Sequence, residues 1–296
     1  MIKYVILIPS FNDWECLNLL IPKIDHALKT TNENVDVLIV NDGSTKKNNL
    51  VFKNMLHLKK IEVLNLRNNV KAQIAIATGL NFLKKEKFQG GIIVMDGDGQ
   101  DDPSYLVDLI KESKKKPERT ITVNRTKRED ELSFKVSYQT YLFLSFLLTF
   151  NYLKFGVFSY LHSSSLDKIL STNDIYLAYP ASLAKHFKDK SVIFAPRKKR
   201  IFGQSQNTYK SLTHYALKII SVFRNRVLIN SAAFVFISFL LSKFIAYSAF
   251  FLLVLSALLI FNIIIFLLAN QINKSHIVKN TLTNVENIEN LRNENL

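Results

Sequence analysis

Residues 90–102 read GGIIVMDGDGQDD, an apolar run that ends in four aspartates, Asp96, Asp98, Asp101 and Asp102. The whole chain is basic, with a formal net charge of +15 over 296 residues. Carboxylates this close together repel one another unless positive charge lies among them. A solvated turn that caps a helix would explain the stretch, because Asp and Gly are ordinary turn residues. The alternative is a site for a divalent cation, and the rest of the chain bears on that choice.

The first part of the chain alternates short apolar runs with amphipathic stretches. Five runs are rich in Val and Ile and lack polar alternation, as strands buried on both faces do: 3–8, 36–41, 61–66, 91–96 and 120–125. Helices are predicted between them at about 13–29, 46–58, 70–85 and 103–115. This order predicts an α/β fold with a doubly wound, mostly parallel sheet, which binds ligands beyond the carboxyl ends of its strands. Those ends carry Ser10, Asp42, Asp96 and Arg125.

Composition narrows the class of partner. Hydrophobic residues make up 48% of the chain and charged residues 21%, and the isoelectric point is near 9.7. A basic chain favours an anionic partner, such as nucleic acid, an anionic membrane face or a phosphorylated substrate. Cys16 is the single cysteine, so no disulfide forms within the chain, which fits a reducing compartment. The apolar start of the chain is too short for a signal-peptide core and fits a buried strand better.

The later part of the chain has the character of a membrane protein. Residues 138–161 are apolar and aromatic with polar interruptions, which indicates one or two amphipathic helices on a membrane surface. A buried core helix is the alternative for this segment. Residues 227–272 are almost entirely apolar, and Lys243 is their sole charge. Since one span needs about 20 residues, this run predicts two transmembrane helices joined by a turn near 243–247.

Basic residues precede this hairpin, and Lys274 and Lys279 follow it. By the positive-inside rule, we expect an integral protein of the cytoplasmic (inner) membrane with both termini in the cytoplasm. The anionic leaflet then accounts for the positive charge and argues against nucleic acid as the partner. The expected organisation is a catalytic domain at 1–226 with interface helices at about 135–170 and 208–226, a hairpin at 227–272 and a polar tail at 273–296. We expect that tail to be a flexible end or a short surface helix.

The acidic run has the chemistry of a metal site. Asp96 and Asp98 are alternate residues at a strand end, so their carboxylates can point toward the same ion. Mg²⁺ and Mn²⁺ prefer hard oxygen ligands and often bind through one or two carboxylates plus substrate phosphates. Gln100 adds a carbonyl oxygen, and Gly97 and Gly99 let a phosphate approach the backbone. The pattern favours a Mg²⁺ or Mn²⁺ site over a plain turn.

A second acidic turn lies upstream, where Asp42 ends a predicted strand and Gly43 and Ser44 follow. A carboxylate there can accept hydrogen bonds from a base N–H or a ribose hydroxyl. An Asp-Gly turn with a Ser or Thr helix cap explains the same residues without a ligand.

Four ordered motifs resemble a known family. They are Ile8-Pro9-Ser10-Phe11-Asn12-Asp13, Val40-Asn41-Asp42-Gly43-Ser44, MDGDGQDDP at 95–103 and RKKRIFGQS at 197–205. Together they resemble the family 2 glycosyltransferases of the GT-A fold, and within them the dolichyl-phosphate mannosyltransferase-like branch, which loads sugars onto polyprenyl phosphate. The motifs cover roughly residues 1–230, and the apolar pair resembles the transmembrane hairpin of bacterial members.

The resemblance implies roles for individual residues. A nucleotide pocket would be lined by Pro9, Phe11, Asp13, Val40, Asp42, Asp96 and Gly97. Mg²⁺ or Mn²⁺ would be held against the donor diphosphate by Asp96, Asp98 and Gln100. Arg125 and Arg200 would bind phosphate oxygens, and Arg197 with Arg200 would bind the acceptor phosphate. Asp98, Arg125 and Arg200 are thus the residues expected to carry catalysis.

The implied reaction is inverting transfer of a sugar from a UDP- or GDP-sugar to polyprenyl (undecaprenyl) phosphate, which supplies a lipid-linked sugar for cell-surface glycan. The attacking phosphate oxygen is already anionic at neutral pH, so positioning and electrostatics would supply the catalysis. A homo-oligomer, a tetramer by resemblance, is a further expectation. Departures at Asn41, Val70 and Gln206 from the family's V-D-D-G-S, R-N-x-G-K and G-x-S-K patterns leave the donor open.

Two other interpretations remain. The same fold would also serve an enzyme that transfers sugar to another lipid or to a growing glycan. A catalytically silent membrane scaffold is a hypothesis of another class. The intact Asp96, Asp98, Gln100 and Arg200 argue against the scaffold, because a scaffold has no use for a metal site.

Overall fold

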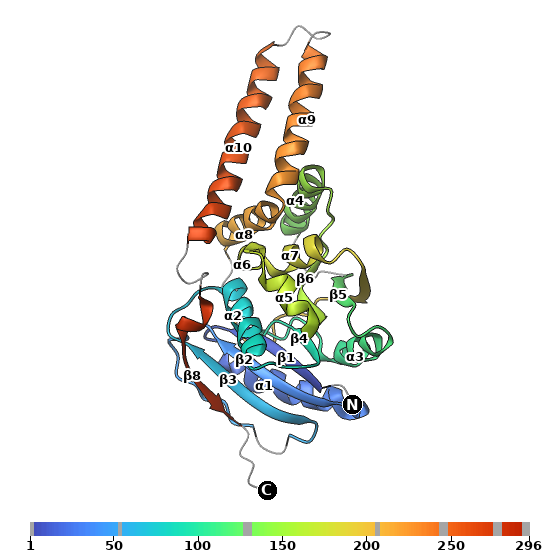
Figure 1. Ribbon diagram of the computed structural model, residues 1–296, viewed down its shortest axis with the longest axis vertical. Coiled ribbons are helices and arrows are strands. Elements are labelled where there is room, and N and C mark those ends of the chain that lie inside the picture. Colours follow the sequence, from blue (N-terminus) through green and yellow to red (C-terminus); the bar gives the residue numbers. More distant parts are fainter. Residues whose placement is uncertain are drawn as a thin grey trace. The chain divides into compact units, whose positions relative to one another are not determined.

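The computed structural model describes residues 3–52, 55–126, 132–204, 208–242, 248–274 and 280–291. The chain divides into two compact units, the first made of Met1–Glu129, Lys154–Gln206 and His276–Leu296 and the second of Asp130–Leu153 and Asn207–Ser275. All of the described strands belong to the first unit, and the long apolar helices belong to the second (Figure 1).

The first unit is built on an eight-stranded sheet of order β7-β5-β6-β4-β1-β2-β3-β8. Its strands are β1 (Lys3–Ser10), β2 (Asn34–Asn41), β3 (Leu58–Leu66), β4 (Gly91–Val94), β5 (Thr120–Arg125), β6 (Phe155–His162), β7 (Lys190–Ala195) and β8 (Val285–Asn290). β1 pairs in parallel with β2 and β4, β2 with β3, and β5 with β7. β6 runs antiparallel between β4 and β5, and β8 runs antiparallel along β3. The predicted α/β fold with a mostly parallel sheet is confirmed.

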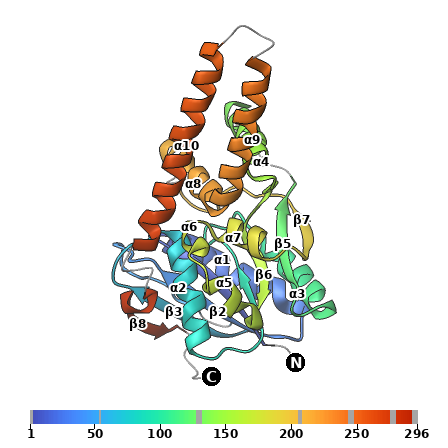
Figure 2. The same cartoon turned by 45° about the horizontal axis from the view of Figure 1, so that its top comes forward.

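Helices cover both faces of this sheet (Figure 2). On one face, Tyr4, Ile6 and Ile8 of β1 join the buried cluster formed with α1 (Trp14–Ala27) and α3 (Leu106–Lys115). On the other face, α2 (Ala72–Lys85) lies so close that a Cβ on its Gly79 would meet Leu7 and Val40. Alternate residues of a strand point to opposite faces, so both sets of β1 side chains are buried. This is why the strands read as continuous apolar runs.

Shorter elements complete the unit. The helices α5 (Leu166–Leu170), α6 (Asp174–Leu177) and α7 (Tyr179–His186) contact α2 on its face of the sheet. Single 3₁₀ turns lie at Leu28–Thr30 (η1), Pro103–Tyr105 (η2), Ser163–Ser165 (η3) and Thr281–Asn284 (η4). The five predicted strands are all found, as are the predicted helices that correspond to α1, α2 and α3.

The predicted helix at 46–58 is wrong. Its described residues form no helix, and Leu58 already begins β3. The reason lies in Asp25, a buried carboxylate on α1 that accepts hydrogen bonds from the backbone N–H groups of Leu56 (3.1 Å), His57 (2.8 Å) and Leu58 (2.8 Å). Donors that a helix would have bonded internally are bonded by this side chain instead.

Two other expectations are corrected by strands. The predicted surface helix at 138–161, and the interface region drawn at about 135–170, hold α4 (Leu132–Thr149), but the chain then enters β6 at Phe155. Most of β6 is buried, because it fills the sheet between β4 and β5. The tail at 273–296 is neither a flexible end nor a surface helix where it is described, because Val285–Asn290 form β8. Its polar sequence, VENIEN, suits an exposed edge strand and carries no apolar signal.

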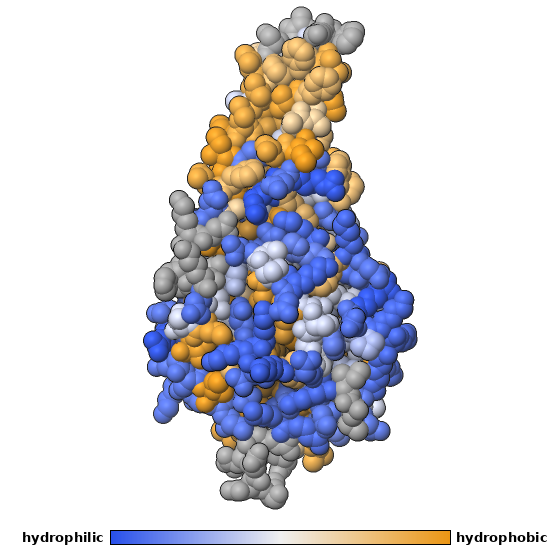
Figure 3. All heavy atoms as spheres, in the orientation of Figure 1, coloured by the Kyte–Doolittle hydropathy of each residue, from blue (hydrophilic) through white to orange (hydrophobic). Residues whose placement is uncertain are grey.

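The second unit contains α4, α8 (Tyr209–Val222), α9 (Arg224–Ser242) and α10 (Ser248–Lys274). Within α9 and α10, Arg224–Ser242 and Phe251–Ile272 are long and apolar enough to cross a membrane, and few of their residues are buried. Figure 3 shows hydrophobic atoms gathered over these helices. Exposed apolar side chains are unlike those of a soluble core helix, and the two helices match the predicted hairpin. The predicted turn at 243–247 lies outside the described residues.

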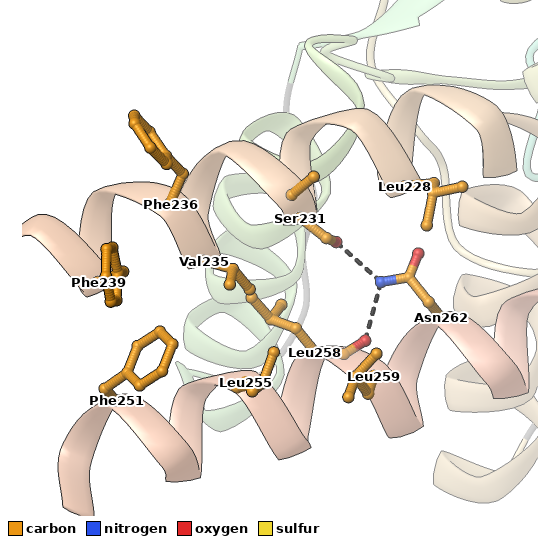
Figure 4. A pocket seen from close by; sticks show the side chains of 11 residues that line it. Leu228, Ser231, Val235, Phe236, Phe239, Phe251, Leu255, Leu258, Leu259 and Asn262 are labelled. Atoms are coloured by element: carbon orange, nitrogen blue, oxygen red, sulfur yellow. Dashed lines mark hydrogen bonds between the residues drawn. The ribbon is translucent and has the colours of Figure 1, made fainter. Parts of the chain in front are cut away.

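Polar groups tie these helices together. Asn262 Nδ2 of α10 donates to Ser231 Oγ of α9 at 2.9 Å and to the Leu258 carbonyl at 2.8 Å (Figure 4). These bonds border a cavity of about 390 Å³ whose walls are mostly apolar side chains of α9 and α10. Asn230 Nδ2 donates to the Leu148 carbonyl at 2.9 Å and so joins α9 to α4. Such amide bonds act as polar links between helices in apolar surroundings.

Candidate active site

The acidic run is a closed turn at the carboxyl end of β4. Asp96 N–H donates to Asp101 Oδ2 at 3.1 Å, and Gln100 N–H donates to Asp98 Oδ1 at 3.0 Å. Gly99 has a φ of +76°, a left-handed conformation that glycine adopts without steric cost. Asp102 caps the next 3₁₀ turn by accepting from Ser104 N–H at 3.1 Å. Asp98, Asp101 and Asp102 therefore each accept a backbone N–H bond that holds the turn.

The loop that follows β7, at 197–202, packs against this acidic turn. Lys198 N–H donates to the Gln100 carbonyl and Ile201 N–H to the Asp98 carbonyl, each at 3.0 Å. Arg197 donates to Gln100 Oε1. Lys198 Nζ also lies 2.7 Å from Asp102 Oδ2. The motifs at 95–103 and 197–205 thus form one site, although Ser205 and Gln206 lie outside the described residues.

Arg200 bridges two predicted site carboxylates. Its guanidinium donates to Asp13 Oδ1, and its Nη1 lies 3.7 Å from Asp98 Oδ2. The Arg200 Nε donates to the Phe202 carbonyl at 2.8 Å, which fixes the plane of the guanidinium. Only 16% of the Arg200 side chain is exposed. Three positions predicted separately are therefore in one ion-paired group.

Arg125 forms a second bridge, at the end of β5. Its Nη2 lies 3.9 Å from Asp96 Oδ2 and 3.8 Å from Asp101 Oδ1. A Cβ on Gly156 of β6 would land on this guanidinium, at 2.7 Å from its Cζ. Glycine at position 156 leaves the space that the Arg125 guanidinium occupies beside the two carboxylates. The resemblance implies that Arg125 binds phosphate. In the structure its positive charge lies beside the Asp96 and Asp101 carboxylates of the acidic turn.

Burial raises the pKa values of three carboxyl groups at the site, those of Asp13, Asp96 and Asp101. Burial, followed by the Asp101 and Asp98 carboxylates, raises the pKa of Asp96. Burial likewise raises the pKa of Asp101 against the opposing effect of Arg125, and that of Asp13 against the effect of Arg200. Three carboxyl groups have raised pKa values although three arginines lie among them. Further positive charge placed beside these oxygens would lower these pKa values.

The donor set suits a hard divalent cation that takes part of its ligands elsewhere. Among the described residues, no three His, Cys, Asp or Glu side chains are grouped as a complete metal-binding set. Asp96, Asp98 and Gln100 do supply oxygen atoms on one turn, and Asp96 and Asp98 keep 31% and 19% of their side chains exposed. Mg²⁺ commonly binds through one or two carboxylates and completes its shell with water and phosphate. The residues present fit that pattern.

The predicted nucleotide residues lie on the neighbouring strand ends. Asp42 is buried, its Oδ1 accepts from Val70 N–H at 2.7 Å, and burial raises its pKa to about 6. Gly43 has a φ of +65°, and a Cβ there would lie 2.7 Å from the Asn68 backbone. The loop after β2 therefore packs directly against the loop after β3.

The other predicted nucleotide residues differ in exposure. Phe11 is half-buried, whereas Pro9 and Val40 are buried within the sheet. The Val40 side chain faces Gly79 of α2, so only its backbone is available to a ligand on the other face. Gly97 has little spare room, because a Cβ there would lie 3.0 Å from Ile8 Cγ2.

Two residues of the site, Asp101 and Gly156, were not predicted as site residues, and a third, Ser10, was predicted only as a polar strand end. Asp101 lies in the acidic run, where the structure pairs it with Arg125. Gly156 sits in an ordinary strand sequence and carried no signal. Ser10 Oγ is buried at the end of β1, and within the described part of the chain it has no hydrogen-bond partner. A buried hydroxyl without a partner at this edge suits a ligand group that donates or accepts a hydrogen bond.

Comparison with known proteins places this geometry in a family. The family model described as glycosyl transferase family 2 matches residues 5–168, which is more than half of the chain. A Bacillus subtilis (strain 168) protein named uncharacterized glycosyltransferase YkcC is 29% identical over 135 residues. The match covers 45% of this chain and 40% of that relative, so less than half of the relative's length is represented.

Solved structures share the fold at low identity. Glucosyl-3-phosphoglycerate synthase from Mycobacterium tuberculosis, in complex with Mn²⁺, UDP-glucose and phosphoglyceric acid, has a TM-score of 0.50 at 10% identity, over 76% of this chain and 80% of that one. S. aureus TarS 1–349 in complex with UDP-GlcNAc has a TM-score of 0.47 at 14% identity, over 77% and 69% of the two chains. The fold is that of GT-A enzymes, and the chain belongs to glycosyl transferase family 2.

Proposed function

We propose that this glycosyltransferase moves a sugar from a UDP- or GDP-sugar to polyprenyl phosphate, with undecaprenyl phosphate as the specific acceptor. The reaction would take place at the cytoplasmic face of the inner membrane, require Mg²⁺ or Mn²⁺, and supply a lipid-linked sugar for cell-surface glycan. The observation that carries the proposal is the contact between the acidic turn and the basic loop, made by Arg200 with Asp98 and by Arg197 with Gln100.

The donor half of the proposal rests on that contact. Asp96, Asp98 and Gln100 would hold the metal ion, which when bound neutralises charge on the leaving diphosphate. Arg197 and Arg200 already reach the same turn, and a guanidinium pairs with phosphate oxygens in a bidentate manner. Asp42 and the residues around it would orient the base and ribose. The chain therefore supplies carboxylates and guanidinium groups to the same diphosphate.

The acceptor half rests on the second unit. α9 and α10 expose apolar surface along most of their length, and α4 exposes Phe143, Leu144 and Phe146. Arg226 of α9 lies over the ring of Phe150 at 5.9 Å, which places a cation beside exposed aromatic groups. Apolar helices with basic flanks suit a bilayer with an anionic leaflet. A lipid acceptor with a phosphate head is the substrate such a setting favours.

The order of the strands supports the orientation of the hairpin. β7 precedes α9 and β8 follows α10 in the chain, yet both strands belong to the same sheet. Two segments of one sheet lie on the same side of a membrane, so the chain between them must cross an even number of times or not at all. A two-helix hairpin formed by α9 and α10 satisfies this condition.

The proposed reaction needs no strong general base. The nucleophile would be a phosphate oxygen of the lipid, which is anionic at neutral pH, and its attack from the face opposite the leaving diphosphate inverts the anomeric carbon. The contribution of the protein is to hold the two phosphates in line and to place cations around the developing charge.

The test is donor turnover by the full chain in detergent. A panel of UDP- and GDP-sugars is incubated with undecaprenyl phosphate and Mn²⁺, with and without EDTA. We expect one donor to give a glycolipid, sensitivity to EDTA, and no product from Asp98→Ala. Asp108→Ala, which changes an exposed aspartate of α3, is the matched control and should retain activity.

Each outcome has a separate meaning. Fluorescence of Trp14, the single tryptophan and a buried residue of α1, reports whether the first unit of each variant is folded. Full activity of Asp98→Ala would remove Asp98 from the site. Nucleotide binding without a lipid product would point to another lipid or glycan acceptor. Absence of both binding and turnover would favour the catalytically silent scaffold.

A further inference from the structure

The last described strand of the chain covers the edge of the sheet beside the donor site. β8 pairs antiparallel with β3, with Asn65 opposite Asn287 and Val63 opposite Glu289 (Figure 1). β3 would otherwise be the edge strand, with a row of unpaired backbone groups. Backbone pairing explains why β8 adds to β3. It does not explain why β8 carries Asn287 and Glu289, since any polar residue suits an exposed edge strand.

Those polar side chains continue a row of amides across the sheet. Asn65 Nδ2 of β3 donates to Asn287 Oδ1 at 2.7 Å and to Glu289 Oε1 at 2.8 Å. Asn41 Nδ2 of β2 donates in turn to Asn65 Oδ1 at 2.7 Å. Asn41 lies opposite Asn65, and Asn65 opposite Asn287, so the row follows the register of the sheet.

The row ends in the loop that follows β2. Asn41 Oδ1 accepts from Ser44 N–H at 3.0 Å, and Ser44 Oγ accepts from Asn12 N–H at 2.8 Å. Asn41 and Asn65 each donate through the amide nitrogen and accept through the amide oxygen, and Asn287 accepts through its oxygen. The amide row therefore runs from β8 to the loops after β2 and β1, which carry Asp42 and Phe11.

The 3₁₀ turn η4 before β8 holds the adjoining loop. Asn284, a buried residue of that turn, accepts from Asn68 Nδ2 and donates to the Asn68 carbonyl, both at 3.2 Å. Its own carbonyl accepts from Arg67 N–H at 2.9 Å. Asn68 is the residue that packs against Gly43, and two residues further on Val70 N–H donates to Asp42. The segment 281–290 thus contacts the loop after β3 through Asn284, and the chain after β2 through Glu289, whose Oε2 accepts from Asn48 Nδ2 at 3.3 Å.

We propose that residues 281–290 are a positioning element of the donor site, in which Asn287 and Glu289 act through Asn65 and Asn41 on the loop at 42–45. This inference rests on the proposed role of that loop in binding the nucleoside diphosphate. If Asn287 and Glu289 are removed, both acceptors of Asn65 Nδ2 are lost, and a buried amide must rotate or remain unsatisfied. Rotation of Asn65 breaks its bond to Asn41 Nδ2, and the Asn41 amide that holds the Ser44 N–H then loses the partner that fixes its orientation.

The test compares two faces of β8 in the full chain in detergent. The double variant Asn287→Ala/Glu289→Ala removes the acceptors. Glu286→Ala is the matched control, because Glu286 is exposed and lies on the opposite face of the same strand. The donor KM of the double variant is expected to rise about tenfold while kcat changes less than about twofold. The control should match the wild type. Asn287→Ala alone keeps Glu289 as an acceptor and should give a smaller rise.

A relay variant tests the route. In an Asn65→Ala background, adding Asn287→Ala should produce no further rise in KM, because the bond between Asn65 and Asn287 is already absent. An equal rise in both backgrounds would overturn the proposed route. A fall in kcat with KM unchanged, or an effect of Glu286→Ala as large as that of the double variant, would overturn the proposal itself.

A second readout does not depend on activity. Amide hydrogen exchange of residues 43–46 is measured in the wild type and the double variant, with Trp14 fluorescence as the check on folding. Faster exchange in the double variant sustains the coupling, and unchanged exchange overturns it. If the wild type binds neither UDP nor GDP in a titration, the proposed function fails, and the exchange result still decides the positioning role of the segment.

Discussion

Replacing Asp42 with Asn should stabilise the catalytic unit at neutral and alkaline pH while weakening donor binding. Asp42 is 3% exposed, and burial raises its pKa from 3.8 to about 6 despite the hydrogen bond from Val70 N–H. Asn keeps an oxygen acceptor for Val70 and carries no charge. The substitution therefore removes the cost of burying the ionised carboxylate and preserves the loop contact.

The size of the effect follows from the pKa. A rise from 3.8 to about 6 corresponds to about 3 kcal/mol, since each pKa unit is worth about 1.4 kcal/mol. Because the folded-state pKa is the higher one, the contribution of Asp42 to stability is complete below pH 4 and is lost as the pH rises through 6. The variant should therefore equal the wild type near pH 4 and exceed it by up to about 3 kcal/mol at pH 8.

The assay is urea unfolding at pH 4, 6 and 8 with Trp14 fluorescence, which reports on the unit that contains Asp42. The expected gain at pH 8 moves the urea midpoint up by about 1 M. Asp102→Asn is a control of opposite sign: burial alone would raise the pKa of Asp102, but Lys198 and Ser104 hold it below its usual value. That variant should lose stability at pH 8 and little below pH 4. An Asp42→Asn variant no more stable than the wild type at pH 8 would refute the reasoning.

Three further predictions concern the bridges and the hairpin. Arg200→Ala removes the cation between two carboxylates and is expected to lower kcat/KM about 100-fold, measured as glycolipid formation; unchanged kinetics would take Arg200 out of the site. Gly156→Ala should displace the Arg125 guanidinium and lower kcat/KM about tenfold, and activity equal to that of the wild type would show that Arg125 tolerates another position. Asn262→Leu removes the interhelical bond to Ser231 and should lower the thermal stability of α9 and α10, followed by circular dichroism in detergent, by about 0.5–2 kcal/mol; an unchanged transition would show that this bond contributes nothing.

Strands β1, β2 and β4 could be predicted from the sequence because they are buried on both faces of the sheet. The segments that became β1, β2 and β4 are continuous runs of Val, Ile and Leu, and burial alone explains them. β8 is the opposite case, since only two of the six residues in its sequence VENIEN are apolar, Val285 and Ile288, and its partner strand is more than 200 residues away in the chain. Single-sequence patterns carry no information about such pairings.

The candidate site could be predicted as a set of residues but not as an arrangement. Spacing placed Asp96 and Asp98 together, because two residues apart on an extended segment is a local fact. The pairing of Arg200 with Asp13 joins positions 187 apart, and it depends on backbone bonds between the loop after β7 and the turn after β4. Gly156 shows the same limit, since its importance comes from the guanidinium that lies on it.

The pairing of β8 with β3 limits how the chain between β7 and β8 can cross a membrane. β8 follows α10 in the chain, and it pairs with β3 only if the chain returns to the side on which the catalytic unit lies. A hairpin that crosses a bilayer twice meets this condition, and a single crossing does not. A chain that stopped within α10, or crossed only once, would lack Asn287 and Glu289 beside Asn65. If 281–290 hold the loop at 42–45 as proposed, that loop would lose support in such a chain, and donor binding is expected to weaken when the proposed hairpin is not correctly inserted.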